Sequence, residues 1–438
     1  MRFGLTRRRC IVRGGAPYLP RKKGRACGRA AGAETRRALR AGGMVALLAA
    51  LVLLAAPAAA QNVIDATAHE RSLEPVDLEA SHVTALLAET PDFAARAGGE
   101  EAERVRAKLN RHVAAMLDGW PWKAFHNTLG ISGYEAYFNH PDEVVYALAI
   151  ALPQLDNAVR PKARRFLADL IKEHPPYDRE GFLNRRGRPR ERYTVPDGLR
   201  PGGHGKANGR FGVYALWAYC HWGDAPDAAE AHLEAVAKRM APALEKPYAF
   251  DIRKQDYSHD EAERLTADLA GLVGLARLAR MAGEADTAHR ARAKALELLR
   301  LRVNLERVNP KILEKTHSAS KTLHIAKLAR YCDLVPEVAR TVAELSGGMG
   351  KARLAAFRAK RNAWYLAFTE RLIGGENYVS PPHMGRAMMA GATFVERLPA
   401  EDLLAFVDIP WCEGDLYFIE KCTYSLWAAA GRKWKRVE

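Results

Sequence analysis

The chain has 438 residues, 48% of them hydrophobic, and its 67 Lys and Arg residues outnumber its 51 Asp and Glu residues to give a net charge of +16. Residues 1–60 carry thirteen of these cations against one acid, so residues 61–438 have a net charge of only +4 and composition gives no support to a nucleic-acid partner. The hydrophobic content excludes a disordered chain, a collagen and a small disulfide-rich scaffold.

The first sixty residues have the pattern of an export signal. The basic sequence RRALR precedes an apolar run at residues 44–60, which ends in three alanines before the polar Gln61. A basic segment, an apolar segment and a small-residue cleavage site in this order are typical of a secretory signal. We therefore expect cleavage after Ala60 and export to the periplasm or the cell exterior. The alternative is a retained anchor, because such a run is at the lower limit for a membrane span; only then would the protein contact a membrane.

The remainder of the chain is expected to be one helical domain at residues 99–438, preceded by an extension or linker at residues 61–98. Helical periodicity dominates this domain, and strand-like alternation is scarce. Twelve segments carry the pattern of a helix: 101–117, 143–155, 162–173, 211–222, 225–243, 260–281, 285–302, 320–331, 336–345, 352–372, 386–397 and 413–430.

Two types of helix alternate along this domain. Segments such as 211–222 are apolar on most sides, whereas segments such as 285–302 have one apolar stripe and a charged face. A helix that is apolar all round is buried, and a helix with a stripe covers it. The pattern predicts an all-α fold, an (α/α) toroid of about twelve helices arranged as hairpins around an inner ring. A solenoid of helix pairs is the alternative, although no repeat with a fixed consensus is visible.

Four connecting segments separate outer from inner helices. Residues 120–142, 174–210, 248–260 and 374–386 each precede a helix of the apolar type, and each carries His, Tyr and carboxylate or amide side chains. Long loops inside a compact domain are usually functional or disordered. If the inner helices run in one direction, these four loops gather at the same end of the domain, where we expect a site.

The second of these loops ends in a glycine-rich sequence, PGGHGKANGR, at residues 201–210. His204, Lys206, Asn208 and Arg210 alternate there with small residues, so their side chains can point to one side. The loop leads into a helix N-terminus, which favours anions. A carboxylate or sulfate on a substrate would suit this segment. The alternative is a surface loop with solvated charges.

The first loop combines aromatic rings with hydrogen-bonding groups. Such a surface fits a sugar, because a sugar ring has apolar C–H faces and polar edges; a hydrophobic plug of the core is the alternative. The residues concerned include Trp120, Trp122, Tyr134, His126, Asn127 and Glu135. The tryptophans at 217, 222 and 427 lie in helices and are expected in the core.

The other two loops offer further acids and bases. Asp256, Tyr257, His259 and Asp260 have types and spacing that could hold a metal, but opening the next helix as a cap is the simpler interpretation. Glu376, Tyr378 and His383 form a looser set. We predict no metal and no cofactor, and the motifs of serine hydrolases, zinc proteases and dinucleotide-binding proteins are absent from the sequence.

Four cysteines follow the leader, at positions 220, 332, 412 and 422. Export would permit disulfides, and Cys412 and Cys422 are near enough in sequence to pair across a turn. The alternative is that all four are small buried residues.

The export signal, the helix alternation, the segment FGVYALWAYCHWGD at residues 211–224 and the His204 loop resemble the six-hairpin (α/α) toroid group. That group contains glycoside hydrolases and, in related incomplete toroids, polysaccharide lyases. The resemblance implies an exported protein that acts on a carbohydrate polymer or oligomer in a central cleft. A non-catalytic helical scaffold that binds a glycan or a partner protein is the alternative.

The resemblance implies two chemistries. A glycosidase needs two carboxylates that flank the glycosidic oxygen. A lyase needs a Tyr or His base, with a cation or amide that neutralises the uronate carboxylate, and the basic character of the His204 loop favours an acidic glycan. The catalytic candidates are His204, Tyr257, His126, Glu135, Asp256 and Glu376. The substrate-binding candidates are Trp120, Trp122, Asn127, Tyr134, Lys206, Asn208, Arg210, His259, Tyr378 and His383.

Overall fold

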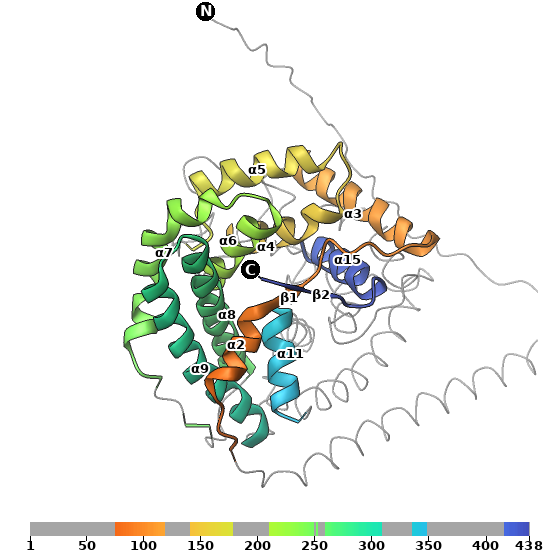
Figure 1. The fold of residues 1–438 in the computed structure, drawn as a ribbon. Coiled ribbons are helices and arrows are strands. Elements are labelled where there is room, and N and C mark those ends of the chain that lie inside the picture. The colour runs from red at the N-terminus through yellow and green to blue at the C-terminus, as the bar shows by residue number, and fades with distance from the viewer. Residues whose placement is uncertain are drawn as a thin grey trace, which may run out of the picture. The chain divides into compact units, whose positions relative to one another are not determined.

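The computed structural model describes residues 75–118, 141–177, 210–248, 251–252, 259–308, 335–347 and 416–437. All of them belong to Leu53–Glu438, one of the two units into which the chain divides. These residues form ten α-helices, one 3-10 turn and two three-residue strands (Figure 1). The all-α prediction is confirmed for this part of the chain.

Most elements lie where the sequence predicts a helix, whereas the helix at residues 80–88 and the strands at residues 89–91 and 434–436 correspond to no predicted element. In chain order they are α2 (Ala80–Ala88), β1 (Glu89–Pro91), α3 (Glu100–Asp118), α4 (Pro141–Ala151), the 3-10 turn η2 (Leu152–Gln154), α5 (Arg160–Glu173), α6 (Phe211–Trp222), α7 (Asp227–Glu245), α8 (His259–Met281), α9 (Ala285–Val308), α11 (Pro336–Leu345), α15 (Leu416–Ala429) and β2 (Trp434–Arg436). Nine of the twelve predicted helices are confirmed, and those predicted at 320–331, 352–372 and 386–397 lie outside the described residues.

Burial alternates between successive helices. In α6 every side chain except that of His221 is buried, and in α8 the stretch 265–279 is buried without a break. The intervening α7 buries one stripe, which repeats every three to four residues from Ala229 to Ala243 and leaves the opposite face in solvent. The buried helices α4, α6 and α8 are therefore inner, and the amphipathic α5, α7 and α9 cover them.

The inner helices run in the same direction. Helices α6 and α8 touch backbone to backbone, because a Cβ on Gly271 would lie 2.6 Å from the carbonyl oxygen of Arg210, and one on Gly274 would lie 2.7 Å from the Cα of Tyr214. The contact partner moves from Arg210 to Tyr214 in α6 as the glycine moves from Gly271 to Gly274 in α8. The two helices are therefore parallel. The close approach requires glycine at both positions of α8.

Helices α4 and α15 continue the same row. Tyr146 in the middle of α4 packs on Phe211 at the start of α6, with ring centroids 5.2 Å apart. At the other end, Phe93 packs on Trp222 of α6 and Trp427 of α15, and its carbonyl oxygen accepts a hydrogen bond from Gln154, just after α4. Helices α15, α4, α6 and α8 are thus neighbours in this order and begin at the same end.

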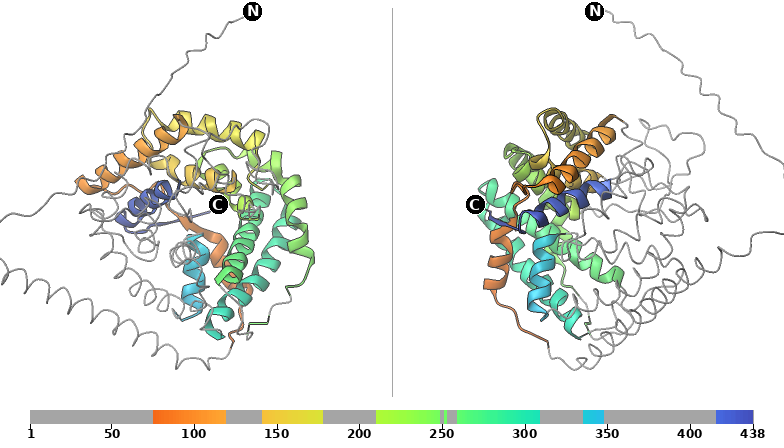
Figure 2. Two further views of the ribbon diagram at one scale, coloured as in Figure 1. Left: turned by 180° about the vertical axis from the view of Figure 1, so that it is seen from behind. Right: turned by 90° about the vertical axis from the view of Figure 1, so that its right-hand side faces the viewer.

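The outer helices run against the inner ones. Arg106, near the start of α3, donates to Gln154, just after the end of α4. Arg302, near the end of α9, donates to Thr266, near the start of α8, at 3.1 Å. The views of Figure 2 show α8 beside α9 and α3 beside α15, in agreement with the contacts between these elements.

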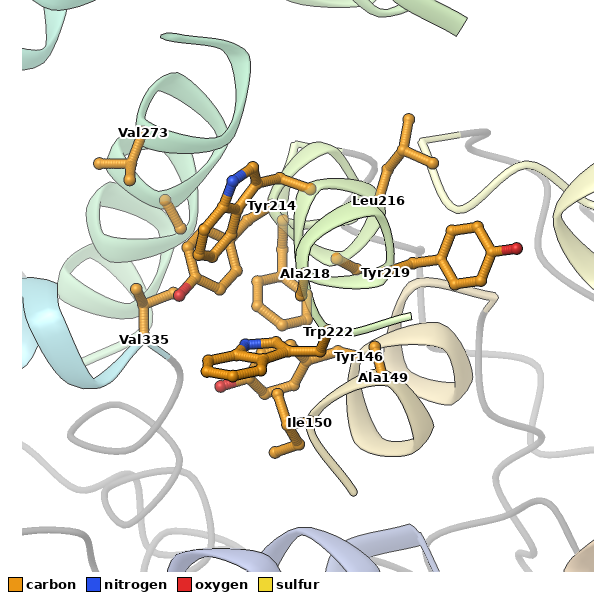
Figure 3. Close-up of a cluster of buried hydrophobic side chains, with 14 of the residues drawn as sticks. Tyr146, Ala149, Ile150, Tyr214, Leu216, Ala218, Tyr219, Trp222, Val273 and Val335 are labelled. Atoms are coloured by element: carbon orange, nitrogen blue, oxygen red, sulfur yellow. The ribbon is translucent and has the colours of Figure 1, made fainter. Parts of the chain in front are cut away.

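Aromatic side chains fill the space between the inner helices (Figure 3). Tyr146, Tyr214 and Trp222 project from α4 and α6 into this cluster, which aliphatic residues such as Ile150 and Val273 complete. Trp217 and Trp427 are among the largest fully buried side chains, and Trp222 is 7% exposed. The expectation that the three helical tryptophans belong to the core is confirmed.

A two-stranded antiparallel sheet joins the two ends of the described chain. Glu89 of β1 pairs with Arg436 of β2, and Pro91 pairs with Trp434. Strand β1 follows directly from α2, which packs against α9. Residues 80–91 therefore belong to the packed structure although they lie in the segment that the sequence presents as an extension.

Candidate functional site

The described residues include only a small part of the predicted site. His259 is the first residue of α8, and its side chain is not described. The remaining predicted residues, except Arg210, lie outside the described residues: Trp120, Trp122, His126, Asn127, Tyr134, Glu135, His204, Lys206, Asn208, Asp256, Tyr257, Glu376, Tyr378 and His383.

Arg210 lies at the N-terminal boundary of α6 and belongs to a polar cluster with two residues that sequence reasoning missed. Its Nη1 atom donates to the hydroxyl of Tyr248 at 2.8 Å and forms an ion pair with Oδ2 of Asp268 in α8. Tyr248 also donates to the same carboxylate oxygen. The side chain of Asp268 is 2% exposed, whereas that of Arg210 is 24% exposed, so the cluster is buried on its acidic side and open on its basic side.

Helix α9 supports this cluster from the opposite side of Tyr248. The backbone N–H of Tyr248 donates to Oε1 of Glu297 at 3.1 Å, and Nζ of Lys294 donates to Oε2 of the same carboxylate at 2.6 Å. Lys294 also donates to the carbonyl oxygen of Lys246 at 2.7 Å. The segment 246–248 is thereby fixed on α9 through its backbone and on α8 through the Tyr248 hydroxyl.

The phenol of Tyr248 stays protonated in this setting. Burial raises its pKa above the ordinary value, and the neighbouring Asp268 carboxylate raises it further, while the Arg210 guanidinium acts in the opposite direction. Tyr248 therefore serves as a hydrogen-bond donor to Asp268 at neutral pH. The cluster can hold a polar ligand through Arg210, but Tyr248 is not prepared to act as a base.

This cluster connects two of the predicted loops. Arg210 is the last residue of the predicted loop 174–210, and Tyr248 is the first residue of the predicted loop 248–260. Their side chains are in hydrogen-bond contact, and Asp268 holds both. Because α4, α6 and α8 are parallel neighbours, the segments that lead into them all attach at the same end of the helix row.

A second cluster contains the same three chemical groups and is closed to solvent. Arg277 of α8 forms an ion pair with Oε1 of Glu337 in α11 at 2.6 Å, and Tyr214 of α6 donates to the same oxygen at 2.6 Å. The side chains of Arg277 and Glu337 are 0% exposed. Oε2 of Glu337 has no hydrogen-bond partner among the described residues.

The Arg277 guanidinium is surrounded by carbonyl oxygens and an aromatic ring. It donates to the carbonyl oxygens of Leu86, Leu87 and Glu89, where α2 passes into β1. Its Cζ atom lies 4.2 Å from the ring centroid of Trp217 in α6, a cation–π geometry. Arg277 therefore connects α8 with α6, α11 and the start of the sheet, and this cluster is a structural one.

Two tyrosines extend the buried network to α15. The hydroxyls of Tyr146 and Tyr424 lie 2.6 Å apart, and the rings of Tyr146 and Tyr214 lie 5.9 Å apart. Burial raises the pKa of Tyr146, Tyr214 and Tyr424 well above the ordinary value, so all three remain neutral donors. Sequence reasoning missed this network; the available signal was Arg277, a single cation within the apolar stretch GLVGLARLA of α8.

The described residues also bear on the cysteines, on a metal site and on a membrane span. Cys220 and Cys422 are free, buried thiols, in agreement with the alternative to a disulfide, and Cys332 and Cys412 lie outside the described residues. Within the described ranges no group of three or more His, Cys, Asp or Glu side chains could hold a metal ion. None of the described helices is both long enough and apolar enough for a membrane span.

Comparison of the chain with known proteins found no match to a family model, to a curated protein or to a solved structure. Functional assignment therefore depends on the residues themselves.

Proposed function

We propose that the chain is an exported (α/α) toroid that acts on an acidic polysaccharide or oligosaccharide, by lyase or hydrolase chemistry, at the end where its inner helices begin. The row of parallel inner helices α15, α4, α6 and α8, each covered by an antiparallel outer helix, supports the toroid. In such a ring all loops that precede inner helices open onto one end.

The contact between Arg210 and Tyr248 is the observation that carries this proposal. It brings the end of the His204 loop to within 2.8 Å of the beginning of the Tyr257 loop. Two catalytic candidates that are far apart in sequence therefore belong to loops with a shared anchor. Asp268 fixes that anchor from the interior, which leaves the partly exposed Arg210 on the side of solvent.

The proposed lyase reaction assigns a role to each type of side chain in these loops. His204 or Tyr257 takes the proton on the carbon beside the uronate carboxylate, while Lys206 and Arg210 balance the negative charge that develops on that carboxylate. The electron pair forms a carbon–carbon double bond as the glycosidic C–O bond breaks, and the leaving oxygen gains a proton. In the hydrolase version, two of Glu135, Asp256 and Glu376 act as acid and base or nucleophile.

One observation favours the non-catalytic alternative, a scaffold that binds a glycan or a partner protein. Both Arg–carboxylate–Tyr clusters of the described residues are paired internally, and the Arg277 cluster is fully buried. An ion pair of this kind fixes helices whether or not a reaction takes place nearby. The scaffold predicts glycan binding without any change in the glycan.

An assay with uronic-acid polymers separates these possibilities. The intact protein is incubated with polygalacturonate and with alginate, and ultraviolet absorbance and new reducing ends are followed together. A lyase raises both signals because its product contains a double bond; a hydrolase raises only the reducing ends; a scaffold raises neither.

Substitution of the His204 loop provides the second part of the test. His204→Ala should abolish turnover and leave thermal unfolding nearly unchanged. His289→Ala is the matched control, because His289 is an exposed histidine of α9. Full activity in the His204 variant would remove this loop from the mechanism.

A further inference from the structure

A second charged surface lies at the opposite end of the helix row. Helix α15 ends near β2, and the segment Arg432–Arg436 reads RKWKR. Lys433, Lys435 and Arg436 are exposed, and Arg432 is half-buried. Among the described residues these four cations make no ion pair, which distinguishes them from Arg106, Arg210, Arg277, Lys294 and Arg340.

The backbone holds this segment in one conformation. The carbonyl oxygen of Lys433 accepts hydrogen bonds from the Trp427 indole at 2.7 Å and from the Asp92 backbone N–H at 2.8 Å. Beyond the strand, Val437 donates to the carbonyl oxygen of Ala88 at 2.8 Å. A ligand of this surface would not have to order the backbone when it binds, which lowers the entropic cost of binding.

Aromatic rings lie directly beside the cations. The guanidinium of Arg340 stacks over Trp434 at 3.5 Å, and Nζ of Lys435 lies 5.7 Å from the ring centroid of Trp222. Trp434 is half-buried and packs edge-on against Trp427. Two acidic residues lie next to this segment: Glu89 of β1, whose carboxylate Arg340 binds at 3.0 Å, and Asp92, whose Oδ1 accepts from the Ala94 backbone N–H at 3.1 Å. The positive charge of β2 is therefore not compensated within the described structure.

We propose that this surface, formed by Arg432, Lys433, Lys435 and Arg436, is a binding site for an acidic polysaccharide. Four cations within five successive residues, of which Trp434–Arg436 form β2, repel one another, and a polyanion that bridges them removes this repulsion. A lipid bilayer is a poorer partner, because Met281 is the only large exposed hydrophobic side chain among the described residues and it lies in α8, so this surface offers none to insert. The choice of a glycan as the polyanion rests on the proposed function.

Lysines on a strand at the edge of a sheet have a second possible role. They prevent the exposed edge from pairing with another copy of the chain. A single lysine is sufficient for this purpose, whereas β2 carries the exposed Lys435 and Arg436 and is preceded directly by the exposed Lys433. The two roles differ in outcome, because loss of edge protection leads to self-association and loss of a ligand site leads to weaker binding.

The test compares two triple variants of the intact protein that remove the same charge. Lys433→Ala, Lys435→Ala and Arg436→Ala alter the proposed surface; Arg104→Ala, Lys162→Ala and Arg164→Ala alter exposed cations of α3 and α5. Binding to polygalacturonate is measured by affinity electrophoresis, with fully methyl-esterified pectin as the uncharged polymer. We expect the β2 triple variant to bind roughly tenfold more weakly, with a smaller salt dependence, and the control triple variant to bind like the native protein.

Several results would overturn the proposal. Equal losses in the two variants would mean that only net charge matters. Unchanged binding together with dimers in light scattering would assign the cations to edge protection, and stronger binding to anionic phospholipid vesicles or duplex DNA would assign another ligand. The readout does not require turnover, so a protein that binds at β2 without cleaving the polymer would contradict the proposed catalysis and leave the β2 site intact.

Discussion

The two Arg–carboxylate–Tyr clusters permit a direct test of how burial changes the contribution of an ion pair to the free energy of unfolding. Glu337→Gln retains the size of the side chain and its ability to accept from Tyr214, but it removes the negative charge beside Arg277. Removal of one partner of a fully buried pair typically costs about 3–5 kcal/mol. Because the Arg277 guanidinium also has the carbonyl oxygen of Glu89 at 2.7 Å, we expect the lower limit, about 3 kcal/mol.

Asp268→Asn is the matched comparison in the other cluster. Its partner Arg210 is 24% exposed and can be hydrated when the carboxylate is removed, so we expect a loss of only about 1 kcal/mol. Urea unfolding followed by circular dichroism at neutral pH gives both values from the shift of the midpoint at a constant slope. Equal destabilisation by the two variants, or a loss below about 1 kcal/mol for Glu337→Gln, would refute the argument from burial.

Three further predictions concern close packing at a glycine, the burial of a histidine and the burial of two thiols. Gly212→Ala should cost about 3 kcal/mol in urea unfolding, because its Cβ would meet the carbonyl group of Pro176 well inside van der Waals contact; Gly98→Ala, with open space around it, should change stability little. Burial, with help from Lys435 and Arg277, lowers the pKa of His221 to about 4, below the value of about 6.5 in the unfolded chain. The unfolded chain therefore binds the additional proton, so about 3 kcal/mol of stability present above pH 6.5 should be lost as the pH falls to 4, and His221→Gln should reduce this loss. Burial raises the pKa of the Cys220 and Cys422 thiols to about 12, so a thiol reagent should label them only after unfolding in a chain whose other cysteines are serine.

The helices could be predicted because each carries its own periodic pattern. The all-apolar segment 211–222 and the striped segment 336–345 coincide with α6 and α11, and their boundaries follow from breakers such as Gly223 and Gly347. Strands β1 and β2 could not be predicted in the same way. Each has only three residues, and each becomes a strand only through its distant partner.

The polar clusters were inaccessible to sequence reasoning for a related reason. Asp268 and Tyr248 form a cluster only through their hydrogen bonds with Arg210, which lies 58 and 38 positions away in the chain. Sequence spacing identified Arg210 because it ends a glycine-rich loop, but local spacing contains no information on which helix faces that loop. The two glycines of α8 at 271 and 274 were the available signal, since small residues in an apolar helix mark a close backbone approach.

The pairing of β1 with β2 has a consequence for how the molecule is made. The strand that completes the sheet follows the last described helix, so a ribosome has synthesised almost all of the described chain before β1 finds its partner. Contacts between such distant positions form slowly because the intervening chain must first be ordered. The pairing of β1 with β2 is therefore expected to be among the last contacts that a newly made chain forms.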